Sequence, residues 1–287
     1  MGNNIKTGEN EYKASDLLYN LLPSVGGAIA GVGGYFANYP IMLFADYNAQ
    51  NYIKKMQSHN SIFKEAAEEY LNKNNIAYTN INTTNIKKIL SEDSLIADFL
   101  RHDPSIKTDI KKCAKGKHAF VINGKKIYAN FDKASFLTFH EMGHVKNSGK
   151  TFTKLLQMFK YSKANRVIFT LAFFGAIQPN NNKSDETPSA LAKFTMKTLN
   201  FLNKNCIALS ILSCVPEITD EALATVEGNR IAKGLLSNDM YKKVTKLNRK
   251  ALLTYITGGI ATISAIIAAQ FVTKFINKEF VNNQYAA

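Results

Sequence analysis

Cysteine is scarce in this sequence of 287 residues. The three cysteines, Cys113, Cys206 and Cys214, are an odd number and show no C-x-x-C spacing. A disulfide framework requires paired cysteines, and a cysteine zinc site requires closely spaced ones. The sequence therefore indicates neither kind of site, and we expect these thiols to be buried or unreactive.

Recognised nucleic-acid-binding motifs are also missing, although the formal net charge is +14. The lysines are distributed along the chain and are densest beside apolar segments. Anionic lipid headgroups attract basic residues in such positions. We therefore expect a basic surface next to a lipid bilayer and no nucleic-acid partner.

Charge is absent from two long stretches, residues 17–45 and 251–273. A helix crosses a hydrocarbon layer of about 30 Å with about 20 residues, so both stretches are long enough to span a membrane. The second stretch is apolar on every face and is the clearer transmembrane helix. The first is not a typical secretory signal, because acidic and basic residues precede it and no small-residue cleavage site closes it.

The first uncharged stretch contains features that favour opposite interpretations. Gly27 and Gly31 stand at G-x-x-x-G spacing, which lets helices pack closely in lipid. Pro23, Asn38 and Pro40 interrupt the pattern, because proline and asparagine weaken a continuous helix. A re-entrant or broken helix therefore remains an alternative to a single span.

The sequence from His140 to His144 reads H-E-x-x-H. In a helix, His140 and His144 lie one turn apart on one face and can bind a single Zn²⁺. Glu141 then projects beside the metal, where it could take a proton from water activated by zinc and pass it to a leaving amine. This combination of ligands and base is typical of metalloproteases.

A β-hairpin is predicted just upstream of this motif. Residues 119–122 and 125–128 are strand-like and flank Asn123-Gly124, a pair that favours a tight hairpin turn. A strand edge beside the zinc helix could hold an extended peptide by main-chain hydrogen bonds. The other three histidines are expected to be surface residues rather than ligands: His59, His102 and His118.

A catalytic zinc needs a third protein ligand and an open fourth position. The acidic candidates downstream are Glu217, Asp220, Glu221 and Glu227. In a helix that begins near Thr219, Glu221, Thr225 and Gly228 would share one face. Glu217 lies one turn before Glu221 and remains an alternative ligand. Glu227 is rotated away and is expected to face solvent.

The segment from Glu221 to Thr225, Glu-Ala-Leu-Ala-Thr, resembles the E-x-x-A-[DST] helix of gluzincin peptidases. The likeness is greatest to membrane-bound gluzincins of the HtpX and CAAX prenyl protease kind and to their YugP-like relatives. It implies Glu221 as the third zinc ligand. It covers the two short motifs and the pattern of hydrophobic segments, and it does not cover the first 115 residues.

This sequence departs from the HtpX-like pattern at Thr225, where many of those sequences carry an aspartate. That aspartate resembles a group that orients a histidine ligand. Thr225 can form a hydrogen bond but carries no charge. Asp220 either takes over the orienting role or caps the helix, and helix capping is the favoured interpretation.

Two weaker apolar stretches, residues 167–177 and 200–215, lie between the histidines and Glu221. Their length alone favours buried core helices. The resemblance to HtpX-like proteins instead implies a hydrophobic hairpin over residues 167–215 that enters the membrane. Both interpretations remain open at this point.

The basic residues predict an orientation in the membrane. Five precede the last apolar stretch and two follow it: Lys242, Lys243, Lys246, Arg249 and Lys250 before, Lys274 and Lys278 after. The positive-inside rule places the preceding side, with the zinc motifs, in the cytoplasm. The predicted domains are a hydrophobic membrane segment (1–50), a zincin-like metallopeptidase domain (51–250), and a transmembrane helix with a tail (251–287).

The sequence thus predicts a mainly α, membrane-associated protein with a zincin-like helix and a small β-hairpin. The main hypothesis is an integral-membrane zinc metalloendopeptidase that acts on protein or peptide substrates, with Zn²⁺ held by His140, His144 and Glu221. One alternative is a non-catalytic membrane scaffold with a structural or degenerate metal site. Another is a cytosolic peptidase whose apolar segments are buried. Neither the substrate nor the oligomeric state is indicated.

Overall fold

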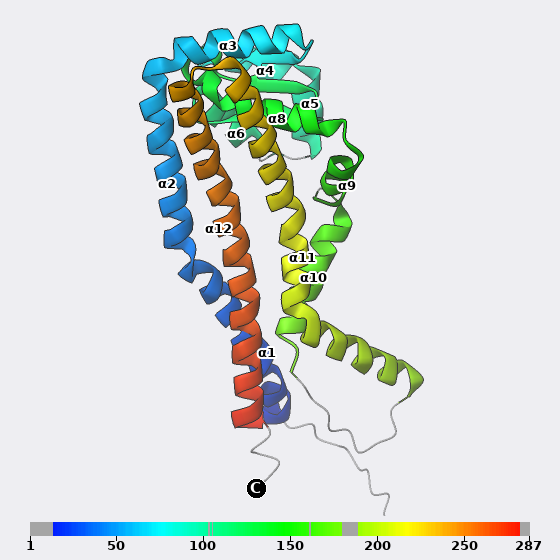
Figure 1. The fold of residues 1–287 in the computed structure, drawn as a ribbon. Coiled ribbons are helices and arrows are strands. Elements are labelled where there is room, and N and C mark those ends of the chain that lie inside the picture. Colours follow the sequence, from blue (N-terminus) through cyan, green and yellow to red (C-terminus); the bar gives the residue numbers. More distant parts are fainter. Residues whose placement is uncertain (1–13, 103, 105, 161, 180–188, 282–287) are drawn as a thin grey trace, which may run out of the picture. The chain divides into compact units, whose positions relative to one another are not determined.

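The protein is mainly helical and has one small mixed β-sheet, as predicted from the sequence (Figure 1). The computed structural model describes residues 14–102, 104, 106–160, 162–179 and 189–281. The chain divides into two compact units. Unit 1 takes in residues 1–38, 166–212 and 261–287, and unit 2 takes in residues 39–165 and 213–260.

Unit 2 contains the sheet and the helices around it. Its shorter helices are α2 (Tyr39–Met56), α3 (Asn60–Lys73), α4 (Ile86–Glu92), α5 (Ser94–His102), α6 (Ile106–Ala114), α7 (Phe131–Ala134), α8 (Thr138–Ser148) and α9 (Thr151–Lys160). Short 3₁₀ turns, Gln57–His59 and Ser135–Leu137, precede α3 and α8. Two long helices contribute one part to each unit, α11 (Ala190–Leu235) and α12 (Asn238–Ile276).

The predicted hairpin is present as the antiparallel pair β2 (Ala119–Ile122) and β3 (Lys126–Ala129). Asn123 and Gly124 at its turn have φ of 54° and 62°, the left-handed conformation for which Asn-Gly is suited. A strand that the sequence analysis did not predict, β1 (Ala77–Asn80), pairs in parallel with β3. The order β1-β3-β2 leaves β2 at an edge of the described sheet, packed against α8.

Buried groups in unit 2 hold the start of α8 in place. Phe63 of α3 packs edge-on against Phe136, with ring centroids 5.7 Å apart. The buried Asn60 side chain donates a hydrogen bond to the carbonyl of Phe131 (2.9 Å) and accepts one from the amide of Ser135 (2.8 Å). Phe139 of α8 is buried in the same core. These contacts tie the segment that leads into α8 to α3.

Unit 1 is built from α1 (Ala14–Ala37), most of α10 (Lys163–Ala176) and the remaining parts of α11 and α12. Glycines of α1 lie directly against α12. A Cβ atom placed on Gly31 would be 3.2 Å from the carbonyl oxygen of Ala265, and one on Gly34 would be 3.0 Å from that of Ser264. The close helix packing predicted from the glycine spacing is therefore confirmed.

The first uncharged stretch forms a broken helix, which was one of the two alternatives. A turn at Asn38 separates α1 from α2, and the Asn38 side-chain amide donates to the carbonyl of Gly34 (2.9 Å). Pro40 is the second residue of α2, where the missing amide hydrogen costs no helical hydrogen bond.

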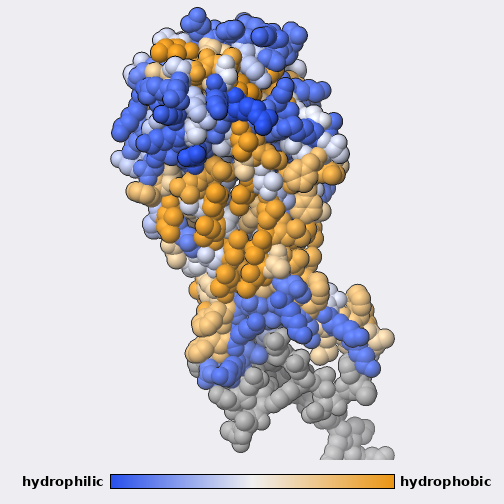
Figure 2. All heavy atoms as spheres, viewed as in Figure 1, coloured by the Kyte–Doolittle hydropathy of each residue, from blue (hydrophilic) through white to orange (hydrophobic). Residues whose placement is uncertain are grey.

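Two segments of the described chain, Leu21–Lys73 and Asn238–Glu279, contain helix that is long and apolar enough to cross a membrane. Large apolar side chains are exposed along them, including Ile29, Phe44 and Phe271. In Figure 2, hydrophobic residues gather along the middle of the long helices and hydrophilic residues lie over their lower part. Hydrophilic residues predominate over the α3 and α4 region of unit 2. The spans predicted from the absence of charge thus coincide with exposed apolar helix.

Candidate metal centre

Two helices of unit 2 bring His140, His144 and Glu221 together. The histidines lie one turn apart on α8, and Glu221 lies on α11. Glu221 Oε2 is 3.0 Å from His140 Nε2 and 3.5 Å from His144 Nε2. The candidate ligand atoms all lie within 4.8 Å of one another, and the three side chains are 12%, 9% and 5% exposed. This group could hold a metal ion.

The two helices approach closely because each presents a glycine at the crossing. A Cβ atom on Gly143 of α8 would lie 2.8 Å from the carbonyl carbon of Ala224 and 2.9 Å from the amide nitrogen of Gly228. A Cβ atom on Gly228 of α11 would lie 3.0 Å from the carbonyl carbon of Phe139. Side chains larger than hydrogen are thus excluded at this contact, and the exclusion places Glu221 within reach of both histidines.

The second nitrogen of each histidine also has a polar neighbour on α11. Thr225 Oγ1 lies 3.4 Å from His140 Nδ1, so the threonine contacts a candidate ligand. Asp220 Oδ2 lies 3.7 Å from His144 Nδ1. With one polar group near each Nδ1, both rings present Nε2 to the position between the helices, an arrangement typical of metal-binding histidines.

The prediction that Asp220 caps a helix is wrong. The helix does not begin near Thr219, because α11 runs without interruption from Ala190 to Leu235 and includes Pro216. Asp220 is therefore an interior helix residue, and its side chain is only 3% exposed. Its position beside His144 fits the alternative role of orienting that ring.

Lys160 is a member of the site that the sequence did not reveal. It is the last residue of α9, and its Nζ lies 3.2 Å from Glu221 Oε1 and 3.7 Å from Asp220 Oδ2. Its side chain is 13% exposed. Lys160 thus contacts the Glu221 oxygen opposite the histidines. In the sequence, Lys160 is only one of several basic residues between Lys150 and Arg166. No motif relates a lysine at this distance to the H-E-x-x-H helix, so its place in the site could not be predicted.

Burial and charge act together on the titrating groups of the metal-free site. Burial alone would lower the pKa of His144, but hydrogen bonds to Asp220 and Glu221 raise it to about 10. Burial opposes ionisation of Glu221 as well, yet the two histidines hold its pKa well below the ordinary value. For Glu141 burial prevails and raises the pKa, as its nearly enclosed position implies.

The alternative ligand Glu217 lies outside the cluster. Its side chain is 52% exposed and lies 3.9 Å from Lys160. Glu227 was expected to face solvent, and this is wrong: its side chain is 10% exposed and pairs with Arg230 at 3.2 Å. Glu227 does point away from the histidines, as its position on the helix predicted, but other parts of the protein cover that face of α11 as well.

The remaining histidines differ from one another. His59 is half-buried, so its prediction as a surface residue is only partly right; its Nδ1 lies 3.0 Å from the Ser58 hydroxyl. His118 precedes β2 and is half-buried, so its prediction as a surface residue is only partly right. Burial lowers the pKa of His118. The charges of Asp109 and Glu221 act to raise this pKa, and those of Lys112 and His140 act to lower it. The side chain of His102 is outside the described residues.

The donor set fits zinc. Two imidazole nitrogens and one carboxylate oxygen are a common catalytic zinc set, and bond lengths of about 2.1 Å put tetrahedral ligand atoms about 3.4 Å apart. The two separations from Glu221 Oε2, 3.0 and 3.5 Å, are close to this value. Cysteine takes no part: burial raises the pKa of Cys113, the cysteine on α6, well above its ordinary range.

The fold and the site together define a mainly helical protein with a candidate metal centre of two histidines and one glutamate. No family model, no curated protein and no solved structure matches the chain. The assignment of function therefore depends on the residues of the site themselves.

Proposed function

We propose that this protein is a membrane-bound zinc metalloendopeptidase. The observation that carries the proposal is the meeting of His140, His144 and Glu221 at the crossing of α8 and α11, with Glu141 on the same helical turn. Two histidines and a glutamate leave a fourth coordination position for water or substrate, as in catalytic rather than structural zinc sites.

When bound, Zn²⁺ supplies Lewis acidity and lowers the pKa of water toward about 7. The chain's own contribution is the proton transfer. Glu141 would accept a proton from the attacking water and return it to the leaving amine. Because burial raises the pKa of Glu141, its carboxylate is a stronger base for that step. Lys160 and Thr225 hold Glu221 and His140 in position through the contacts described above.

The edge strand β2 gives the substrate a place to bind. It packs against α8, and no described strand pairs with its outer edge. An extended peptide could add to that edge through main-chain hydrogen bonds, which would recognise backbone rather than side chains. This mode suits an endopeptidase that acts on extended or unfolded segments.

We further propose that the chain is an integral membrane protein with its metal centre on the cytoplasmic side. The two apolar helical segments support insertion. The five basic residues before residue 251, against two after 273, support the orientation. A protein that resists extraction from membranes at alkaline pH is the expected result, and release into the soluble fraction would favour a peptidase whose apolar segments are buried.

Zinc content and hydrolysis test the site separately. Detergent-purified wild type should contain about one zinc per chain, Glu221→Ala should lose it, and Glu217→Ala, a matched change one turn away, should keep it. Glu141→Gln should keep zinc but lose hydrolysis of a fluorescent unfolded protein such as labelled casein.

The possible outcomes separate the hypotheses. Full activity in Glu141→Gln would remove the proposed mechanism. Zinc retained in Glu221→Ala but lost in Glu217→Ala would move the third ligand. Zinc absent from all of these proteins, under conditions that load other zinc proteins, would favour the non-catalytic scaffold.

A further inference from the structure

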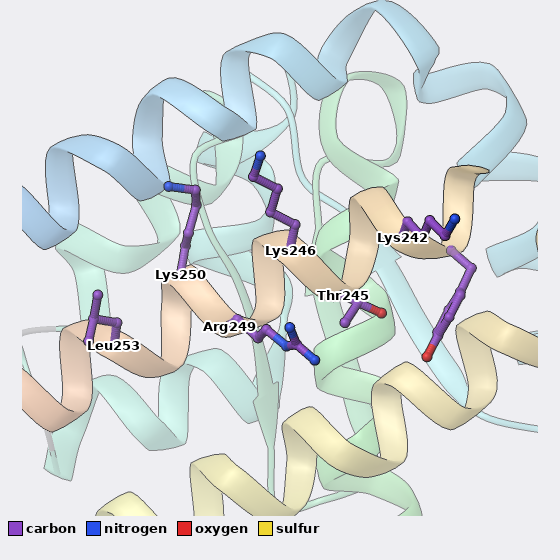
Figure 3. Close-up of a pocket in the computed structure, with 7 residues that line it drawn as sticks. Lys242, Thr245, Lys246, Arg249, Lys250 and Leu253 are labelled. Atoms are coloured by element: carbon purple, nitrogen blue, oxygen red, sulfur yellow. The ribbon is translucent and has the colours of Figure 1, made fainter. Parts of the chain in front are cut away.

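A groove of about 600 Å³ runs along the first part of α12, within unit 2 (Figure 3). Six of its lining residues recur at helical spacing on one face, and four of the six are basic: Lys242, Thr245, Lys246, Arg249, Lys250 and Leu253. No acidic residue lines it. The face is therefore a concave strip of positive charge that ends in an apolar residue.

The basic residues of the groove have no acidic partner in the part of the chain that the structure describes. Among the described residues, no carboxylate lies within ion-pair distance of any of the four, whereas the neighbouring Lys243 is paired with Asp239 at 2.9 Å. Lys246 and Lys250 lie over the ring of Tyr52 on α2, 5.5 and 5.9 Å from its centroid. In Figure 3 both extend toward α2, and Arg249 points to the other side of α12.

Thr245 adds a second, independent observation. Its hydroxyl oxygen is buried and has no hydrogen-bond partner among the described residues. A buried polar atom without a partner is unfavourable, so an external group that forms a hydrogen bond with it would be favoured. Thr245 lines the groove, but in Figure 3 its oxygen points away from Lys246 and Lys250, so a change of its rotamer would bring the hydroxyl to a bound anion.

The place of the groove on α12 indicates the source of such an oxygen. Lys246, Arg249 and Lys250 precede the uncharged stretch that starts at Ala251 by one to five residues, or roughly 2–8 Å of helix. Headgroups occupy a layer of about 5–8 Å on each side of the hydrocarbon. If that stretch spans, the three cations stand at the level of lipid phosphates, and Leu253 lies beside the first acyl carbons.

We propose that this groove binds the phosphate-bearing headgroup of an acidic phospholipid. Lys246 and Lys250, which both extend toward α2, contact the phosphate, and Leu253 contacts the acyl chain. The Thr245 hydroxyl reaches one of the phosphate oxygens through a change of rotamer. The proposal rests on the membrane placement of α12 given above, but not on zinc or on peptidase activity.

The test uses the full chain in a neutral detergent and a short-chain phosphatidylglycerol, with short-chain phosphatidylcholine as the neutral probe. Binding is followed by native mass spectrometry, which counts bound lipids. Wild type should bind one phosphatidylglycerol saturably and phosphatidylcholine weakly. Lys246→Gln with Lys250→Gln should bind it roughly thirtyfold more weakly, from about 1 kcal/mol for each basic residue. Thr245→Val should show a smaller loss.

A matched control distinguishes binding in the groove from general attraction between charges. Lys107→Gln with Lys111→Gln makes the same charge change at exposed positions of α6 and should leave binding unchanged. An equal loss in this control would mean general charge attraction and would overturn the proposal. Inorganic phosphate that competes as well as the lipid would reassign the groove to free phosphate. Preferential binding of an oligonucleotide, lost in the groove variant, would reassign it to nucleic acid.

The membrane placement is judged by a different measurement. Resistance to alkaline extraction of wild type reports whether the chain is inserted, and the groove variant should be extracted no more readily, because α12 and its apolar stretch are unchanged. A chain that is inserted but does not bind phosphatidylglycerol would refute the groove and leave the membrane placement intact.

Discussion

Replacing Gly143 with alanine should damage the metal centre without touching any metal ligand. The added Cβ atom would lie 2.8 Å from the carbonyl carbon of Ala224 and 2.9 Å from the Gly228 amide nitrogen, where ordinary contact begins near 3.4 Å. The obstacle is backbone, which cannot rotate away. Helices α8 and α11 must therefore separate by at least about 0.5 Å, given the difference between these distances.

Metal sites tolerate much smaller displacements. Ligand distances in zinc sites stay within about 0.2 Å of their preferred values. The two histidines are on one of the separating helices and Glu221 is on the other, so the displacement acts directly on the ligand set. We expect Gly143→Ala to bind zinc at least about tenfold more weakly, and to lose about 1–3 kcal/mol of stability from overpacking.

The assay is competition for zinc between the detergent-purified protein and a chelator of known affinity. Gly149→Ala is the matched control, because Gly149 directly follows α8, has a φ of −75°, and leaves open space around its Cβ position. Gly234→Ala is the equivalent control on α11. Wild-type zinc affinity in Gly143→Ala would refute the argument that the glycine crossing sets the ligand geometry.

Two further predictions concern single side chains. Asp220→Asn removes the charge beside His144 and should weaken zinc binding by about 10–100-fold, with circular dichroism showing unchanged helix content. Asp93 accepts hydrogen bonds from Lys126 (2.8 Å) and from the hydroxyl of the fully buried Tyr128 (3.1 Å). Burial opposes ionisation of Asp93. Hydrogen bonds from Lys126, the Ile96 amide and Tyr128 nevertheless hold the pKa of Asp93 below its ordinary value. Its contribution to stability is therefore complete above the unfolded-state pKa of about 3.9 and is lost as the pH falls through the folded-state value. Asp93→Asn should cost about 1–3 kcal/mol near pH 7, and the difference from wild type in thermal unfolding should shrink below about pH 4; a difference that grows on acidification would contradict this sign.

Some expectations from the sequence were confirmed because they depend on short-range geometry. The spacing of His140 and His144 places both on one face of any helix, and Asn123-Gly124 supplies the two positive φ angles that a tight hairpin needs. The glycines of α1 permit close packing for the same kind of reason, since their spacing puts small residues on one face.

Other expectations were wrong or missing because they depended on neighbours far away in the sequence. Thr219 and Asp220 suggested the start of a new helix, but α11 runs through both residues and through Pro216 without interruption. Glu227 was placed correctly on the helix and wrongly in solvent, because rotation on a helix does not reveal which other elements cover that face. The strand β1 is four residues long and pairs in parallel with a strand about 50 residues away.

The sequence by itself determined the candidate residues of the site: two histidines with Glu141 between them on one helical turn, and a glutamate at a motif downstream. It also determined two stretches without charge. Only the tertiary structure decided which carboxylate meets the histidines, that Lys160 contacts it, and that Asp220 lies beside His144 instead of capping a helix. The physical reason is range. Helical periodicity fixes neighbours within a few residues, whereas contacts across about 80 residues depend on how α8 and α11 cross, and that crossing is set by the two glycines where their backbones touch.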